Sequence, residues 1–180
     1  MIKKRTDSFF PETKDIPKQF ALENSIMLNE YLIGGNLKTW KGPFREAFSP
    51  VCIRTSSGLV PQFIGSYPLL TEVESMEALS AAQRAFNNGR GFWPALPVEE
   101  RIKCFEAFLS GMKHKREEIA KILMWEIGKP YGDSLKEFDR TIVYIKDTIR
   151  ALKKQERTAH RLSSEQGIIG RMKKVPLGVA

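Results

Sequence analysis

Cysteine and histidine are scarce in this chain of 180 residues: Cys52 and Cys104 are its two cysteines, and His114 and His160 are its two histidines. The cysteines lie far apart, and neither pair of residues has the spacing of a metal-binding motif. We therefore expect two reduced thiols, no disulfide and no metal site. A zinc enzyme is not indicated.

Long apolar runs are also missing. No stretch approaches the roughly 18 apolar residues that a membrane span requires, so no membrane partner is expected. The chain has a basic start at residues 1–5, but Thr6, Asp7 and Ser8 follow where a signal peptide would need an apolar run. These two absences predict a cytoplasmic protein.

The third absence is a glycine-rich phosphate-binding loop. Neither Gly-x-Gly-x-x-Gly nor a Walker sequence occurs, so no dinucleotide-binding residue can be assigned in this chain. What is present is ordinary for a globular protein, with 42% hydrophobic and 28% charged residues. The length suits one domain, or one domain with a substantial appendage, and is sufficient to bury a core.

The net charge of +8 is concentrated near the end of the chain. From Arg140 to Lys174 there are ten Lys or Arg against three Asp or Glu, a local net charge of +7. Three explanations are open: a nucleic-acid-binding surface, a site for an anionic substrate or cofactor, and a surface whose acidic complement is missing. No aromatic RNA-binding motif, zinc finger or helix-turn-helix signature accompanies the basic run, which makes nucleic acid the weakest of the three.

Short extended segments are predicted in the first 70 residues. Residues 1–28 are polar and interrupted by proline, and we expect an extended arm with a short helix near residues 18–23. A hairpin is expected around Gly34-Gly35-Asn36, between residues 31–33 and 37–40. A second extended pair is expected at residues 50–53 and 62–66, on either side of a turn at Ser56-Ser57-Gly58.

The apolar period changes from 2 to 3.6 after Thr71, which predicts four helices. The first begins with the capping box Thr71-x-x-Glu74 and is expected to end at Gly89 and Gly91. The second begins near Pro97, and the third stops at Gly128, ahead of Pro130. The four apolar stripes are Val73, Met76, Leu79, Ala82 and Phe86; Ile102, Phe105, Leu109 and Met112; Ile119, Ile122, Leu123 and Ile127; and Leu135, Phe138, Ile142, Ile145, Ile149 and Leu152. Residues 167–179 are expected to form a strand.

On the fourth helix, Asp133, Glu137, Arg140 and Tyr144 recur at intervals of 4, 3 and 4 and therefore share one face, opposite the apolar stripe. One interpretation is an exposed face with a Glu137–Arg140 ion pair covered by Tyr144, which would contribute little to stability. The other is that Arg140 presents its planar guanidinium to a phosphate or carboxylate. The pattern leaves both open.

Several sequence blocks, taken in order, resemble the aldehyde dehydrogenases, closest to the branch of non-phosphorylating, NADP-dependent glyceraldehyde-3-phosphate dehydrogenases. The blocks are Gly34-Gly35 with Trp40, Ser49-Pro50, Gly65-Ser66-Tyr67-Pro68, Gly91-Phe92-Trp93-Pro94 with Arg101-Ile102, Glu126-Ile127-Gly128-Lys129, Glu137-Phe138-Asp139-Arg140-Thr141 and Pro176-Leu177-Gly178-Val179. The resemblance covers the chain from about Tyr31 to Ala180. It implies an α/β fold matching the N-terminal portion of the family, with short antiparallel strands, about four helices and the start of an oligomerisation strand.

The resemblance also implies a division of the chain into four parts. Residues 1–28 would be an N-terminal arm, and residues 29–70 the short strands and hairpin. Residues 71–155 would be a helical layer of the cofactor-binding domain. Residues 156–180 would be the oligomerisation strand, which leads into the rest of the cofactor-binding core.

For function, the resemblance implies NADP-dependent oxidation of glyceraldehyde 3-phosphate to 3-phosphoglycerate by the complete enzyme. Arg140 would help to hold the substrate phosphate. The family's catalytic cysteine, glutamate and asparagine are expected beyond Ala180, so no catalytic, cofactor-binding or metal residue is assigned here, and this chain alone is expected to be inactive. Expected partners are a small phosphorylated aldehyde, the C-terminal portion of the enzyme and further copies in a homo-oligomer. The alternative is a stand-alone helical binding module that uses its basic C-terminal segment for nucleic acid or an acidic protein.

Overall fold

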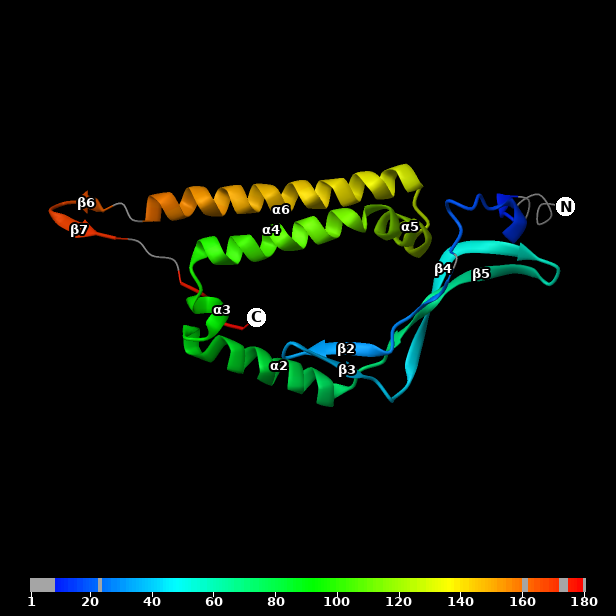
Figure 1. Cartoon of the computed structure of the whole chain (residues 1–180), viewed down its shortest axis with the longest axis horizontal. Helices are drawn as coiled ribbons and strands as arrows, with labels where there is room; N and C mark the ends of the chain where they lie inside the picture. Colours follow the sequence, from blue (N-terminus) through cyan, green and yellow to red (C-terminus); the bar gives the residue numbers. More distant parts are fainter. Residues whose placement is uncertain (1–8, 23, 160–161, 172–174, 180) are drawn as a thin grey trace. The chain divides into compact units, whose positions relative to one another are not determined.

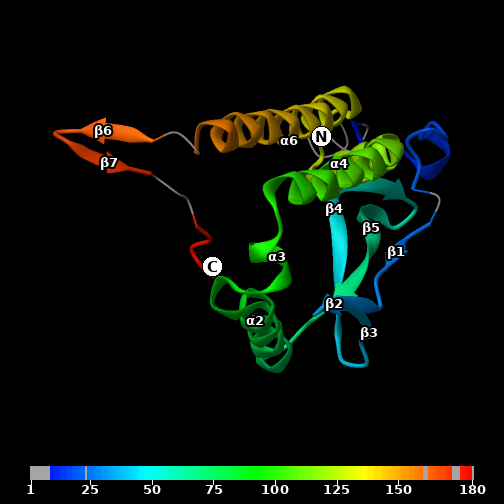
Figure 2. The ribbon, with the colours of Figure 1, turned by 60° about the vertical axis from the view of Figure 1, so that its left-hand side comes forward.

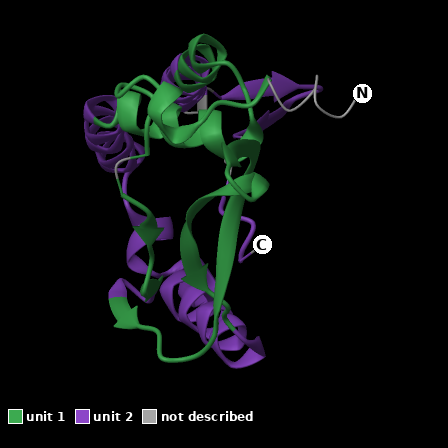
Figure 3. Ribbon diagram, turned by 90° about the vertical axis from the view of Figure 1, so that its right-hand side faces the viewer, with its two compact units in different colours: residues 1–32, 37–70, 115–138 green, residues 33–36, 71–114, 139–180 purple. Residues whose placement is uncertain are grey.

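The computed structural model describes residues 9–22, 24–159, 162–171 and 175–179. It divides into two compact units whose segments interleave along the chain (Figure 3). Unit 1 comprises residues 1–32, 37–70 and 115–138, and unit 2 comprises residues 33–36, 71–114 and 139–180. The predicted four-part division of the chain stays a prediction.

Unit 1 is built on a three-stranded sheet in the order β1-β5-β4. Strands β4 (Phe44–Thr55) and β5 (Gly58–Pro68) pair antiparallel, and β1 (Ile26–Met27) pairs with β5 in parallel. The predicted extended pair is therefore confirmed, but both strands are much longer than their apolar segments because the pairing continues through polar residues. Gly65 lies where the β1 backbone approaches most closely, since a Cβ there would overlap the Ile26 carbonyl oxygen.

The predicted hairpin around Gly34 and Gly35 is also confirmed. Strands β2 (Glu30–Ile33) and β3 (Asn36–Thr39) form a two-stranded sheet. The two glycines between them have φ values of 61° and 80°. Two successive residues with positive φ define the tight turn whose twist matches that of paired strands.

The core of unit 1 joins this sheet to a helix from much later in the sequence. Ile53 and Ile64 of the sheet pack with Trp125 of α5 (Arg116–Ile127), and all three are buried. The Trp125 indole N–H donates to the Phe20 carbonyl at 2.7 Å, and the buried Ser49 hydroxyl donates to the Trp125 carbonyl. These contacts hold α5 against β4 and tie the N-terminal arm to both.

The helix predicted near residues 18–23 was wrong. The arm instead has a short 3-10 helix, η2 (Thr13–Asp15), and a single turn at residues 18–20 in which Phe20 N–H donates to the Pro17 carbonyl at 2.8 Å. The Phe20 carbonyl accepts the Trp125 indole rather than continuing a helix, and Leu22 packs against the core. Tertiary contacts therefore override the weak local helical tendency.

Unit 2 is helical. It contains α2 (Glu72–Phe86), the 3-10 turn η3 (Asn87–Gly89), α3 (Phe92–Ala95), α4 (Val98–His114) and the part of α6 (Tyr131–Ala159) from residue 139 onward. Helices α4 and α6 lie side by side in both views of the ribbon (Figures 1 and 2). The stripe predicted for the fourth helix is confirmed by the burial of Phe138, Ile142 and Ile149.

The end of α2 differs from the prediction. The helix stops at Phe86 because Asn87 adopts the left-handed conformation with φ 45°, two residues before Gly89. Gly91 serves another purpose, since a Cβ there would overlap the Ala85 carbonyl oxygen. The predicted apolar stripe of α2 is largely exposed, including Val73 and Met76.

The single strand predicted over residues 167–179 was also wrong. Strands β6 (Ser163–Glu165) and β7 (Ile168–Gly170) form a short antiparallel hairpin. Its turn has Gln166 and Gly167 with φ values of 50° and 83°. Residues 175–179 have no regular structure, and residues 172–174 lie outside the described part. Within the described ranges, no helix has both the length and the apolar character to cross a membrane.

Candidate functional site

The block that carries the predicted site begins at the end of α5. Gly128 has φ 65° and caps the helix, with its N–H and that of Lys129 both directed to the Met124 carbonyl. A Cβ at Gly128 would lie 3.3 Å from Cγ of Pro50 and 3.5 Å from Cγ2 of Val51. The left-handed backbone favours glycine here, and the chain turns between α5 and α6 at this residue.

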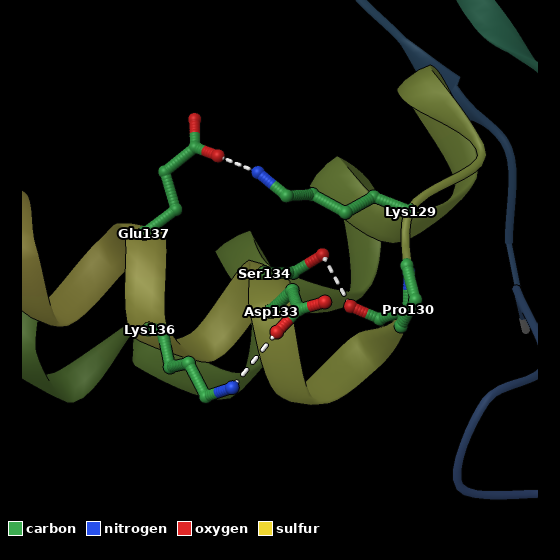
Figure 4. Close-up of polar contacts among 6 residues, drawn as sticks. All are labelled: Lys129, Pro130, Asp133, Ser134, Lys136 and Glu137. Atoms are coloured by element: carbon green, nitrogen blue, oxygen red, sulfur yellow. Dashed lines mark hydrogen bonds and ion pairs between the residues drawn. The ribbon is translucent and has the colours of Figure 1, made fainter.

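The first turn of α6 is closed by Pro130. Its carbonyl accepts the backbone N–H groups of Asp133 and Ser134, each at 3.0 Å, and the Ser134 hydroxyl donates to the same oxygen at 3.3 Å. Ser134 is fully buried. The helix start is therefore fixed by backbone and side-chain hydrogen bonds to one acceptor (Figure 4).

Two ion pairs cover this helix start (Figure 4). The Lys129 ammonium, from the loop before α6, binds the Glu137 carboxylate, and the Lys136 ammonium lies 2.9 Å from the Asp133 carboxylate. The hydrogen bond and charge of Lys136 hold the pKa of Asp133 below its ordinary value. Sequence reasoning missed both lysines as partners, although the Asp133–Lys136 spacing of three was readable as a helical pair.

Arg140, the predicted substrate-binding residue, lies one turn beyond Glu137 on α6, and its side chain is exposed. Tyr144, another turn further on, is 63% exposed. The structure thus places Asp133, Glu137, Arg140 and Tyr144 along one continuous helix, as predicted. It pairs Glu137 with Lys129, a partner from outside the helix that the periodicity could not indicate.

The thiols and the described histidine occupy ordinary surroundings. Cys52 is half-buried in β4 and Cys104 is exposed on α4. The His114 ring nitrogen Nδ1 lies 2.7 Å from the Ser110 carbonyl of its own helix. His160 lies outside the described residues. Among the described ranges, no group of three or more His, Cys, Asp or Glu could hold a metal ion.

The arrangement presents an exposed guanidinium on a firmly anchored helix. Arginine binds phosphate and carboxylate groups through two parallel N–H donors, and a helix fixed at its first turn holds such a donor in a defined position. An arginine exposed in this way is chemically able to bind a phosphate or carboxylate.

The fold is similar to part of two solved α/β structures. An NAD-dependent aldehyde dehydrogenase from Sinorhizobium meliloti matches with a TM-score of 0.62 at 20% identity, over 78% of this chain and 25% of that one. A mutant form of the 1-pyrroline-5-carboxylate dehydrogenase from Thermus thermophilus matches with a TM-score of 0.60 at 20% identity, over 91% of this chain and 27% of that one. The aldehyde-dehydrogenase-like fold is confirmed.

Residues 53–180 match the model of the aldehyde dehydrogenase family. The chain belongs to that family of oxidoreductases, which confirms the predicted family.

The curated relatives are named for different aldehydes. An aminoaldehyde dehydrogenase 2, peroxisomal, from Malus domestica is 29% identical over 143 residues, 77% of this chain and 28% of that protein. A malonate-semialdehyde dehydrogenase 2 from Shouchella clausii is 33% identical over 79 residues, 44% of this chain and 15% of that protein. The matched part of the chain thus spans less than a third of the length of each of these relatives.

Proposed function

We propose that this chain is the N-terminal part of an NAD(P)-dependent aldehyde dehydrogenase. The family match over residues 53–180 is the observation that carries the proposal. The complete enzyme would use NADP to oxidise glyceraldehyde 3-phosphate to 3-phosphoglycerate. It would act in the cytoplasm as a homo-oligomer, and this chain without the C-terminal portion would be inactive.

In this proposal Arg140 binds the substrate phosphate. Its exposure on α6 supports the role, because a guanidinium that projects from a helix is accessible to a ligand. The ion pairs of its helix neighbours support the role too. Glu137 is paired with Lys129, and Asp133 is paired with Lys136. The choice of a phosphorylated aldehyde rests on Arg140 and on the resemblance of residues 137–141 to the glyceraldehyde-3-phosphate branch.

In this proposal NADP binds to residues other than Arg140. The chain has no glycine-rich loop of the kind that holds a dinucleotide pyrophosphate at a helix start. No residue of this chain is therefore given to the cofactor, and the role proposed for the chain is to bind the substrate phosphate. A stand-alone binding module is not favoured, because the family match covers most of the sequence.

The test is a dehydrogenase assay on this chain, alone and mixed with a separately expressed C-terminal portion. We expect NADP-dependent oxidation of glyceraldehyde 3-phosphate only in the mixture. Arg140→Ala is expected to raise KM by roughly ten- to a hundredfold with a smaller change in kcat, because it removes a contact made equally by bound substrate and transition state. Arg150→Ala, on the same helix and paired with Asp147, is the matched control.

Three outcomes would contradict parts of the proposal. A mixture that oxidises an unphosphorylated aldehyde but not glyceraldehyde 3-phosphate would overturn the substrate. Equal KM values for Arg140→Ala and Arg150→Ala would overturn the phosphate role. Activity of this chain by itself would overturn the need for a C-terminal portion.

A further inference from the structure

A continuous groove runs between α4 and α6 within unit 2. One section, of about 690 Å³, lies between residues 98–106 of α4 and 150–157 of α6. A second section, of about 470 Å³, lies between residues 106–113 and 146–153. Glu106, Arg150 and Lys153 line both sections, so the two are parts of one groove. Its lining includes the buried side chains of Ile102, Leu109 and Ile149.

The α6 side of the groove carries a row of cations. Lys146, Arg150, Lys153 and Arg157 all line it, at intervals of 4, 3 and 4 residues. Residues at this spacing lie above one another on a helix, so at 1.5 Å per residue the row is about 16 Å long, with one positive charge per turn. The Arg150 side chain is 78% exposed and paired with Asp147 at 2.8 Å, and the Lys153 side chain is 52% exposed.

Carboxylates divide this row and keep the groove from being uniformly basic. The Lys153 ammonium lies 3.0 Å from the Glu106 carboxylate across the groove. Glu99 and Glu156 also line it, as do Lys103 and Lys113. The lining therefore has six cations and three carboxylates, a net charge of +3.

We propose that this groove binds an acidic helix of a partner protein, one that carries a carboxylate at about every turn. Such a helix matches the spacing of the cations on α6, because neighbouring residues on one helix face are also one turn apart. The apolar residues Ile102, Leu109 and Ile149 are buried beneath the groove, so recognition of such a helix rests on the charged side chains. This inference is independent of the proposed dehydrogenase reaction.

The same residues argue against a nucleic acid as the occupant. A phosphate backbone presents negative charge continuously, and it would meet Glu106 in the middle of the groove and Glu99 and Glu156 near one end. Single-stranded nucleic acid is usually held by stacking of its bases on aromatic side chains. Among the described residues that line the groove, none is aromatic.

Binding of a labelled helical peptide to the full chain tests the proposal. The probe is an alanine-based, fluorescein-labelled peptide of about 16 residues with glutamate at every third or fourth position along one face and leucine beside it. A scrambled peptide of the same composition and a labelled oligothymidylate are the comparison probes. Fluorescence anisotropy is expected to show saturable binding of the designed peptide, tighter than that of either comparison probe and weaker at high salt.

Variants on α6 locate the contact. Lys146→Gln is expected to weaken binding several-fold, and Lys146→Gln combined with Arg150→Gln roughly tenfold or more, because both cations line the groove. Lys154→Gln makes the same chemical change on the same helix, at an exposed position outside the lining, and is expected to stay within about twofold of the wild type.

The outcomes separate clearly. Absence of saturable peptide binding, equal binding of the scrambled peptide, or an equal effect of Lys146→Gln and Lys154→Gln would overturn the groove as a specific helix site. Tighter binding of oligothymidylate than of the designed peptide would overturn the choice of partner and indicate a nucleic acid.

Discussion

Gly128 combines two features: it turns the chain between α5 and α6, and it packs against β4 in unit 1. Its backbone adopts a left-handed conformation with φ 65°, and the space where a Cβ would stand is bounded by Pro50 and Val51 of β4. A Cβ would lie 3.3 Å from Pro50 Cγ, which is a tight contact, and 3.5 Å from Val51 Cγ2, which is an ordinary one. The direction in which the chain leaves α5 is therefore set at this one position.

Gly128→Ala is expected to lower the free energy of unfolding by about 1–2 kcal/mol, from the left-handed backbone alone. Gly132→Ala is the matched control, because Gly132 lies inside α6 with open space where a Cβ would stand. That change is expected to be neutral or to stabilise by up to about 1 kcal/mol. Urea unfolding of both variants is the measurement. Equal free energies of unfolding for the two variants would show that a side chain at position 128 causes no strain.

At the scale of the element, α6 is held at its start by charges that act on one another. The Lys136 hydrogen bond and charge lower the pKa of Asp133, so the carboxylate is held ionised in the folded helix to a lower pH than in the unfolded chain. A lowered folded pKa means that this contribution to stability is present above the unfolded pKa and is lost as the pH falls through the folded one. The stability that this ion pair contributes is therefore lost at acidic pH, as Asp133 becomes protonated.

Lys136→Met is expected to raise the pKa of Asp133 towards its ordinary value, because it removes the main cause of the shift. A carboxyl-carbon NMR titration of Asp133 in the full chain measures this directly. Lys153→Met is the control, since Lys153 binds Glu106 elsewhere on the molecule. A pKa of Asp133 that moves equally in both variants, or in neither, would contradict the local origin of the shift.

The elements also show how far local sequence signals determine the fold. The start of α2 was predictable from Thr71 and Glu74, whose reciprocal capping bonds are present, and the stop of α5 was predictable from Gly128. Both signals are local and carry their own hydrogen bonds. The stop of α2 was not predictable in this way, because Asn87 adopts the left-handed conformation in place of the glycine two residues later. The short α3 was missed because its four residues are too few to show a period.

The candidate site was predictable to a similar depth. The face that carries Arg140 is set by the spacing of residues on one helix, and the structure has that helix. The partner of Glu137 could not be predicted, since Lys129 lies eight residues away across a turn whose geometry depends on Gly128 and Pro130. Contacts that cross a turn or join distant segments, such as Trp125 with Phe20, leave no periodic signal in the sequence.

At the scale of the whole molecule, the two units interleave along the sequence. The fold of unit 1 therefore depends on α5, which follows the α2–α4 segment of unit 2 in the chain. The core of unit 1 takes Ile53 and Ile64 from the sheet and Trp125 from a helix that comes after the α2–α4 segment of unit 2. The sheet by itself is a long hairpin with a two-residue third strand, and such small sheets are marginal in water without a helix on their apolar face.

A chain that ends at His114 is therefore expected to lose the fold of unit 1, although the cut lies between two helices. Removal of Trp125 exposes Ile53 and Ile64 and leaves the Phe20 carbonyl without its indole donor; loss of a buried Trp side chain alone costs about 3–5 kcal/mol. Amide hydrogen exchange of Ile53 and Ile64 is the measurement, and both are expected to lose protection. The control is a chain that ends at residue 161 and so lacks the β6–β7 hairpin and the residues after it. Its Ile53 and Ile64 amides are expected to keep their protection. Protection retained in the shorter chain would mean that the β4–β5 sheet folds without α5.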